Sequence, residues 1–92
     1  METILYKVID ICESNGIDPS FIDELQQNGL IEIIVEENQT YLIEEQVYLL
    51  EKYAVWYYDL ELNVQGIEVV QHLIQRISEL QDEVRLLKRN NL

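Results

Sequence analysis

Carboxylates are the side chains through which this chain has most scope for chemistry. Between Lys7 and Lys52 the sequence contains no lysine or arginine but eleven acidic residues. They are Asp10, Glu13, Asp18, Asp23, Glu24, Glu32, Glu36, Glu37, Glu44, Glu45 and Glu51. Carboxylates act in catalysis beside a nucleophile, a second acid–base group or a phosphate-binding loop, and no such motif accompanies them. We interpret the block as a docking surface for a basic protein, with a merely solvated acidic face as the alternative.

Two further candidates for chemistry are single residues. His72 is the only histidine and falls outside the apolar pattern of its helix, so we expect a solvated surface residue rather than a general base or a metal ligand. Cys12 is the only cysteine and is flanked by apolar positions, so we expect a buried, inert thiol without a disulfide. We therefore predict no enzymatic activity, no cofactor and no metal site.

Length and composition indicate one compact domain. Ninety-two residues suffice for a single core, and a hydrophobic fraction of 48% is ordinary for a globular protein. The formal net charge of −12 should therefore lie mostly on the surface. No apolar run approaches the roughly 20 residues that span a bilayer, and the first residues do not resemble a signal peptide. We expect a cytoplasmic protein that does not bind membranes.

Two short helices are predicted near the start of the chain. The first includes Val8–Cys12 and should end at Asn15–Gly16, where glycine can adopt the left-handed conformation. The second should begin after Asp18, an N-cap followed by Pro19 at the first helical position, and end at Asn28–Gly29. Two helices joined by so tight a turn form a helix-turn-helix.

A β-hairpin wing and a third helix are predicted next. Leu30–Val35 is rich in β-branched residues and Thr40–Ile43 should form the return strand, around an acidic tip at Glu36–Gln39. The third helix should run from residue 44 to about residue 60. Its aromatic run, Tyr53–Tyr58, would either pack in the core or contact a partner, and helical spacing favours packing.

The clearest periodicity lies in the last helix, which Asn63 should cap and which should run from Val64 to near Asn90. Its apolar residues alternate three and four positions apart, the spacing of a coiled-coil seam. This seam comprises Val70, Leu73, Ile77, Leu80, Val84 and Leu87. A helix of this length has no apolar partner within so small a domain, so we predict a homodimer. Gly66 suggests close approach of another helix.

Charge placement favours an antiparallel homodimer, because acidic residues precede basic ones along the last helix. The acidic and basic residues are Glu79, Asp82 and Glu83, followed by Arg85, Lys88 and Arg89. Residues 1–75 hold 2 basic and 15 acidic residues, whereas residues 76–92 hold 4 basic and 3 acidic residues. We divide the single domain into a winged helix-turn-helix-like module, 1–62, and a coiled-coil-like dimerisation helix, 63–92.

The runs YKVIDICESNGIDPSFIDELQQNGLI and LELNVQGIEVV resemble MerR-type helix-turn-helix domains over nearly the whole chain. The resemblance implies a mainly α fold, a MerR-like winged helix-turn-helix with a short β-hairpin wing and a long C-terminal dimerisation helix. MerR-type domains carry an Arg-Tyr-Tyr-type run on the second helix and a basic wing. Here those places hold Asp23, Glu24 and Leu25, and Thr40. Because DNA binding needs cations against phosphate, we do not expect nucleic-acid binding.

The chain is also similar to the chaperone-modulator (CbpM-like) proteins, relatives of the MerR type. The similarity lies in Cys12, Asn15–Ile17, Asp23–Leu25 before Gly29–Leu30, Leu62–Ile67 and a terminal leucine-rich helix. It implies a dimer that binds the J-domain of a DnaJ- or CbpA-like co-chaperone and inhibits its stimulation of a DnaK-type chaperone.

J-domains engage their chaperone through a basic helix, which an acidic surface could occupy. We predict that the contact residues lie on the first two helices, as Asp10, Glu13, Asp18, Asp23 and Glu24. The alternative function is that of a MerR-type DNA-binding transcriptional regulator. A structural adaptor dimer, or an acidic protein that neutralises a toxin, would share the same charge pattern.

Overall fold

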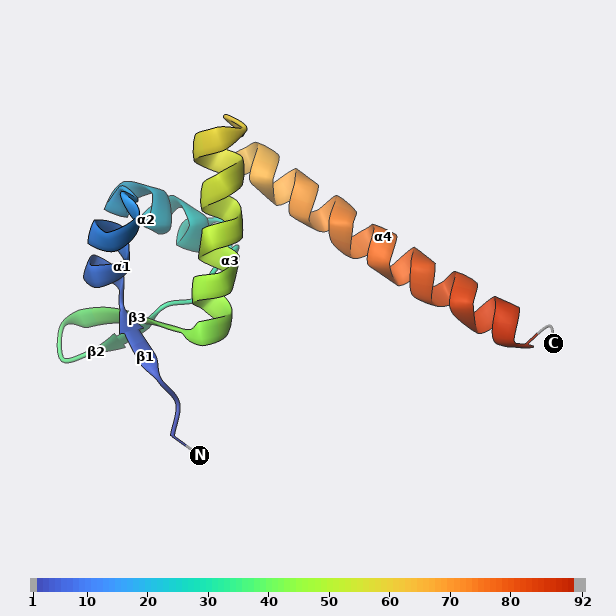
Figure 1. The fold of residues 1–92 in the computed structure, drawn as a ribbon, viewed down its shortest axis with the longest axis horizontal. Helices are drawn as coiled ribbons and strands as arrows, with labels where there is room; N and C mark the ends of the chain where they lie inside the picture. Colours follow the sequence, from blue (N-terminus) through green and yellow to red (C-terminus); the bar gives the residue numbers. More distant parts are fainter. Residues whose placement is uncertain (1, 91–92) are drawn as a thin grey trace.

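The computed structural model describes residues 2–90. Its elements in chain order are β1 (Leu5–Lys7), α1 (Val8–Asn15), α2 (Pro19–Gln27), β2 (Ile34–Glu36), β3 (Gln39–Ile43), α3 (Glu44–Ala54), the π-helix η1 (Val55–Asp59) and α4 (Val64–Asn90). The first three α-helices gather above a small sheet, and α4 projects away from them (Figure 1). The predicted fold class, mainly α with a hairpin wing and a long C-terminal helix, is confirmed.

Capping residues set the limits of α1 and α2 as the sequence predicts. Gly16 follows α1 in the left-handed conformation, with a φ of 63°. Asp18 caps α2, because its carboxylate accepts the backbone N–H of Ser20 at 3.0 Å and Pro19 takes the first helical position. Gly29, with a φ of 72°, closes the other end of α2. These caps hold the two helices in the helix-turn-helix arrangement.

The sheet has the strand order β1-β3-β2 and is antiparallel throughout. β2 and β3 form the predicted wing, with Ile34 opposite Tyr41 and a tight turn at its tip. Glu37 and Asn38 in that turn have φ values of 49° and 64°, as a type I′ hairpin turn requires. β1 is an additional strand that the sequence analysis does not predict, and it pairs along the other side of β3.

The strand predicted over residues 30–35 is wrong for its first four residues. The backbone N–H of Leu30 donates to the Leu25 carbonyl at 2.9 Å and so completes the C-terminal cap of α2. The backbone N–H of Glu32 donates to Oε1 of Gln46 at 2.8 Å. The cap and the glutamine side chain therefore occupy backbone groups that a strand would offer to its neighbour.

The predicted third helix changes its hydrogen-bond pattern before it ends. α3 gives way to η1, in which the Leu60 backbone N–H reaches back five residues to the Val55 carbonyl at 3.3 Å. Glu61 then takes a left-handed φ of 57°. Together these two features turn the chain sharply out of α3 and toward α4.

The start of α4 confirms the predicted cap, because Oδ1 of Asn63 accepts the Gly66 backbone N–H at 2.7 Å. No other helix of the described chain approaches Gly66. A Cβ at Gly66 would lie 3.1 Å from that Asn63 oxygen and 3.8 Å from Cδ2 of Leu62. The missing side chain makes room for the cap of the glycine's own helix.

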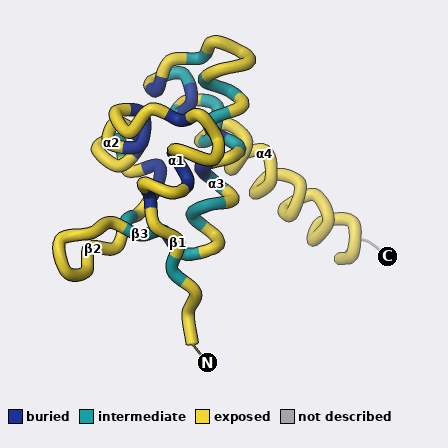
Figure 2. Tube along the Cα trace, turned by 60° about the vertical axis from the view of Figure 1, so that its left-hand side comes forward, coloured by how far each residue is buried: buried dark blue, intermediate teal, exposed yellow. Residues whose placement is uncertain are grey.

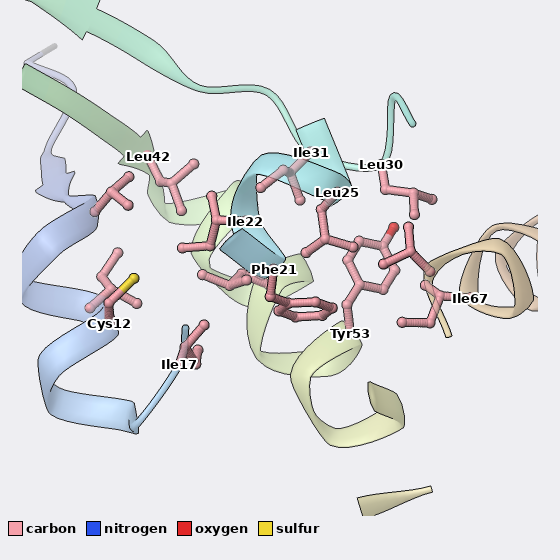
Figure 3. Close-up of a cluster of buried hydrophobic side chains, with 14 residues drawn as sticks. Cys12, Ile17, Phe21, Ile22, Leu25, Leu30, Ile31, Leu42, Tyr53 and Ile67 are labelled. Carbon is pink, nitrogen blue, oxygen red and sulfur yellow. The ribbon is translucent and has the colours of Figure 1, made fainter. Parts of the chain in front are cut away.

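One hydrophobic core joins all the helices. Its buried residues are Val8, Ile11, Cys12, Ile17, Phe21, Ile22, Leu25, Leu30, Ile31, Leu42, Leu50, Tyr53, Val64 and Ile67 (Figure 3). α4 contributes only its first turn to the described core, and most of its length is exposed (Figure 2). The radius of gyration is 16.6 Å, against about 12 Å for a compact chain of this length.

Lys52 ties the base of α4 to α3. Its Nζ donates to Oε1 of Gln71 at 3.1 Å. The same ammonium lies 5.4 Å from the centroid of the Trp56 ring and 5.5 Å from that of Tyr53, within the range of cation–π attraction. These contacts, together with the buried first turn, set the direction in which α4 leaves the body.

Replacing Glu61 by glycine should raise the free energy of unfolding by about 1 kcal/mol, because a left-handed residue with a Cβ is strained by roughly that amount. Urea unfolding at a fixed protein concentration measures the change. Gln75→Gly, in the exposed part of α4, is the control and should lower stability by about 1 kcal/mol. A loss of stability in Glu61→Gly equal to that in Gln75→Gly would contradict the left-handed turn.

Candidate functional site

The five predicted contact residues are all exposed. Asp10 and Glu13 lie on α1, Asp18 caps α2, and Asp23 and Glu24 lie further along α2. Hydrogen bonds from Ser20 hold the pKa of the Asp18 carboxyl below its usual range. The acidic surface therefore spans both helices of the helix-turn-helix.

Several of these carboxylates act on the buried thiol of Cys12. Burial raises the pKa of this thiol, and the negative charges of Asp18, Asp23 and Glu13 raise it further. Coulomb interaction weakens with distance, so these three carboxylates are the ones whose charge reaches the thiol. Asp10 lines a hollow together with Lys7 and residues 38–40.

Cations are scarce on this part of the molecule. Of the two basic residues in the described segment 2–75, Lys52 is half-buried and bound to Gln71 and to aromatic rings. Lys7 is exposed, on β1. The tip of the wing carries the exposed Glu36 and Glu37. A positively charged partner would therefore meet little repulsion on the helix-turn-helix or on its wing.

The aromatic run of residues 53–58 mostly packs inside the protein, as predicted. Tyr53 is buried, and the rings of Tyr57 and Phe21 lie with centroids 4.3 Å apart. Tyr58 differs, because it is 45% exposed and its hydroxyl accepts the backbone N–H of Asp18 at 3.0 Å. The sequence carries no signal for this bond, which joins residues 40 positions apart.

The predicted coiled-coil seam lies open along α4. Its exposed members are Leu73 (57%), Ile77 (54%), Leu80 (42%), Val84 (48%) and Leu87 (62%), whereas Val70 is half-buried against the body. Arg76 pairs with Glu79 at 3.3 Å and Arg85 with Asp82 at 3.2 Å, both within the helix. A continuous apolar stripe of this kind is a candidate surface for a second helix.

Three general features of the described residues bear on the kind of site. No three His, Cys, Asp or Glu side chains in residues 2–90 come together so that they could hold a metal ion. His72 is exposed on α4. Of the helices described here, none is both long enough and apolar enough to cross a membrane.

The chain matches a known protein family. A family model described as MerR HTH family regulatory protein matches residues 6–89. A search of curated proteins found no match. A search of solved structures found none either. The matched segment contains the helix-turn-helix, the wing and nearly all of α4.

The raised pKa of Cys12 should make the fold less stable in alkali. The unfolded chain releases this proton near pH 9 and the folded chain at higher pH, so the free energy of unfolding should fall as pH rises above about 9. Urea unfolding at about pH 7, 9 and 10 should show a smaller fall in Cys12→Ala. Tyr53, whose pKa burial also raises, contributes equally in both proteins.

The same assignment can be tested with one variant of a carboxylate that acts on Cys12 and one control variant elsewhere. Asp23→Asn should reduce the alkaline fall, because it removes a charge that raises the thiol pKa. Glu45→Gln, on the exposed start of α3, should leave the fall unchanged. Equal pH dependence in Cys12→Ala and in the wild-type protein would contradict the assignment.

Proposed function

Because the chain belongs to the MerR HTH family of regulatory proteins, we propose that it is a non-catalytic regulator whose helix-turn-helix binds another protein. The proposed partner is the J-domain of a DnaJ- or CbpA-like co-chaperone in the cytoplasm. The proposed effect is inhibition of the stimulation that this co-chaperone gives to a DnaK-type chaperone. The CbpM-like proteins, which the sequence resembles, act in this way.

The observation that carries this proposal is the acidic helix-turn-helix. Glu13 on α1, Asp18 at the N-cap of α2 and Asp23 on α2 are all exposed. Lys7 is the one basic residue of the described segment 2–51. Such a surface complements a basic helix and would attract it over distances near the Debye length, about 8 Å at physiological salt. Association should therefore be fast and sensitive to salt.

The proposed mechanism is competition for one face of the partner. A J-domain whose basic helix lies against the acidic surface cannot present that helix to its chaperone. Regulation then needs no catalytic group in this protein. It depends on the concentration of the regulator relative to its affinity for the J-domain.

We further propose that two copies pair in antiparallel fashion through α4. The exposed seam gives each copy an apolar stripe, and the order of acidic and basic residues along α4 sets opposite charges against each other in that orientation. Burial of the stripe would supply most of the affinity, because exposed ion pairs contribute at most about 1 kcal/mol each.

The second candidate is a DNA-binding transcriptional regulator. The family match and the arrangement of α1, α2 and the wing favour it, since α2 stands where a recognition helix would enter a major groove. The exposed charges disfavour it. α2 presents Asp23 and Glu24 and the wing tip presents Glu36 and Glu37, all of which repel phosphate.

Charge reversal on α2 should abolish binding to the J-domain. In a calorimetric titration, the wild-type protein should bind one J-domain per chain, and more weakly as salt is raised. Asp23→Lys combined with Glu24→Lys should lower the affinity at least about 100-fold, because like charges would then face each other. The control, Glu44→Lys with Glu45→Lys, makes the same change of net charge at the start of α3 and should retain binding.

The outcomes of that titration separate the candidates. Unchanged affinity in the α2 variant would exclude this face as the contact. Absence of binding by the wild-type protein at micromolar concentration would contradict the J-domain proposal. A salt-sensitive complex with double-stranded DNA, lost in the same α2 variant, would favour the DNA-binding regulator.

A charge placed in the seam should separate the two copies. Leu80→Asp should give a monomer in light scattering coupled to size-exclusion chromatography, because burying an unpaired carboxylate costs more than the leucine contact contributes. Leu86→Asp is the matched control, since Leu86 is 57% exposed and lies outside the seam. A Leu80→Asp protein that stays dimeric at the same concentration would contradict the seam.

A further inference from the structure

A groove runs along one side of α3 and η1. Its lower part is enclosed by β1, α1 and α3, and its upper part by the α1–α2 turn, α3 and η1. Asn15 and Glu51 line both parts, so the two hollows adjoin each other. We name this the α1–α3 groove, after the two helices that contribute to both of its parts.

The groove combines apolar and acidic surface. Tyr6 is 37% exposed, Val55 49% and Tyr58 45%, and all three line it. Large apolar side chains left in water at one site are typical of a docking surface. The lining contains three carboxylates, those of Asp10, Glu51 and Asp59, and one basic residue, Lys7.

The dimensions of the groove suit a helix. Along α3 and η1 the lining extends from Val47 to Asp59, which corresponds to about 18 Å, or a little over three turns. The upper end is formed by the π-helix η1, an element that recurs at functional sites. An occupant of this size would bury an apolar stripe on the groove floor while its flanks face the carboxylates.

We propose that the α1–α3 groove binds a basic amphipathic helix of the partner protein, about three turns long. Apolar side chains of that helix pack on Tyr6, Val55 and Tyr58, and its lysines or arginines lie beside Glu51 and the other carboxylates. This inference rests on the proposed function, because it locates the contact for the partner's basic helix. It extends the predicted contact from the exposed acidic face of α1 and α2 onto α3 and η1, and Asp10 is the member of the five predicted residues that lines the groove.

A synthetic helical peptide tests the groove without any natural partner. The probe has about 14 residues, with leucines along one face and lysines on the other positions, and is titrated into the full-length ¹⁵N-labelled protein. Saturable shifts should centre on the amides of Tyr6, Glu51, Val55 and Tyr58. Glu51→Lys should weaken binding at least about tenfold, the size expected for a charge pair turned repulsive.

Glu45→Lys is the matched control. It makes the same change of charge on the same helix, but Glu45 lies on the side of α3 away from the groove and does not line it. Retained affinity in Glu45→Lys, together with the loss in Glu51→Lys, supports the proposal. Equal affinity in both variants overturns it, and so do shifts confined to α4 or to the outer face of α2, or the absence of saturable binding.

Two further measurements distinguish the J-domain from a second copy of this chain as the molecule that binds in the groove. If Glu51→Lys changes the oligomeric state in light scattering, the groove holds a second copy of this chain, and the proposal is overturned. The J-domain is then titrated into both lysine variants. If the peptide binds in the groove and the J-domain does not bind at all, the groove proposal is supported and the proposed function is refuted. J-domain binding that survives Glu51→Lys and is lost in Asp23→Lys with Glu24→Lys upholds the proposed function and overturns the groove.

Discussion

The contact between Phe21 and Tyr57 is the interaction on which the rest of the structure depends, because it joins the helix-turn-helix to the segment that carries α4. The centroids of the two rings lie 4.3 Å apart, and Phe21 is 2% exposed. Phe21 also meets the edge of Tyr58 at 5.7 Å, and the Tyr58 hydroxyl accepts the backbone N–H of Asp18, the cap of α2. The position of η1 therefore determines both how α2 begins and where the chain departs toward α4.

The fold and the charge of this protein are separable. Among the described residues the buried set is entirely apolar, and the acidic residues lie outside it. Changing the sign of the surface would leave the packing of the helix-turn-helix intact. The same framework can thus carry a basic face toward phosphate or an acidic face toward a basic protein. For this reason the family alone does not select the partner, whereas the distribution of charge does.

Local signals in the sequence predicted most of the fold, whereas contacts between residues far apart in the chain could not be predicted from it. Asp18, Gly16 and Asn63 act on neighbouring backbone groups, so the limits of α1, α2 and α4 could be predicted. β1 forms by pairing with β3 more than 30 residues away, and the π-helix follows the apolar spacing of an α-helix while its hydrogen bonds differ. The acidic surface could be predicted from composition. The α1–α3 groove could not, because β1, α1, α3 and η1 meet only in the folded chain.

The anchoring of α4 has a mechanical consequence. The helix is fixed at its base by Val64, Ile67 and the Lys52–Gln71 bond, and it extends for 27 residues, or about 40 Å. Any rotation of the chain at η1, the pivot, would therefore be amplified along the length of α4. A rotation of one degree at the pivot moves the distal end by about 0.7 Å, given that length. A rotation of about five degrees at the pivot would therefore move the far end by roughly 3.5 Å, given that length.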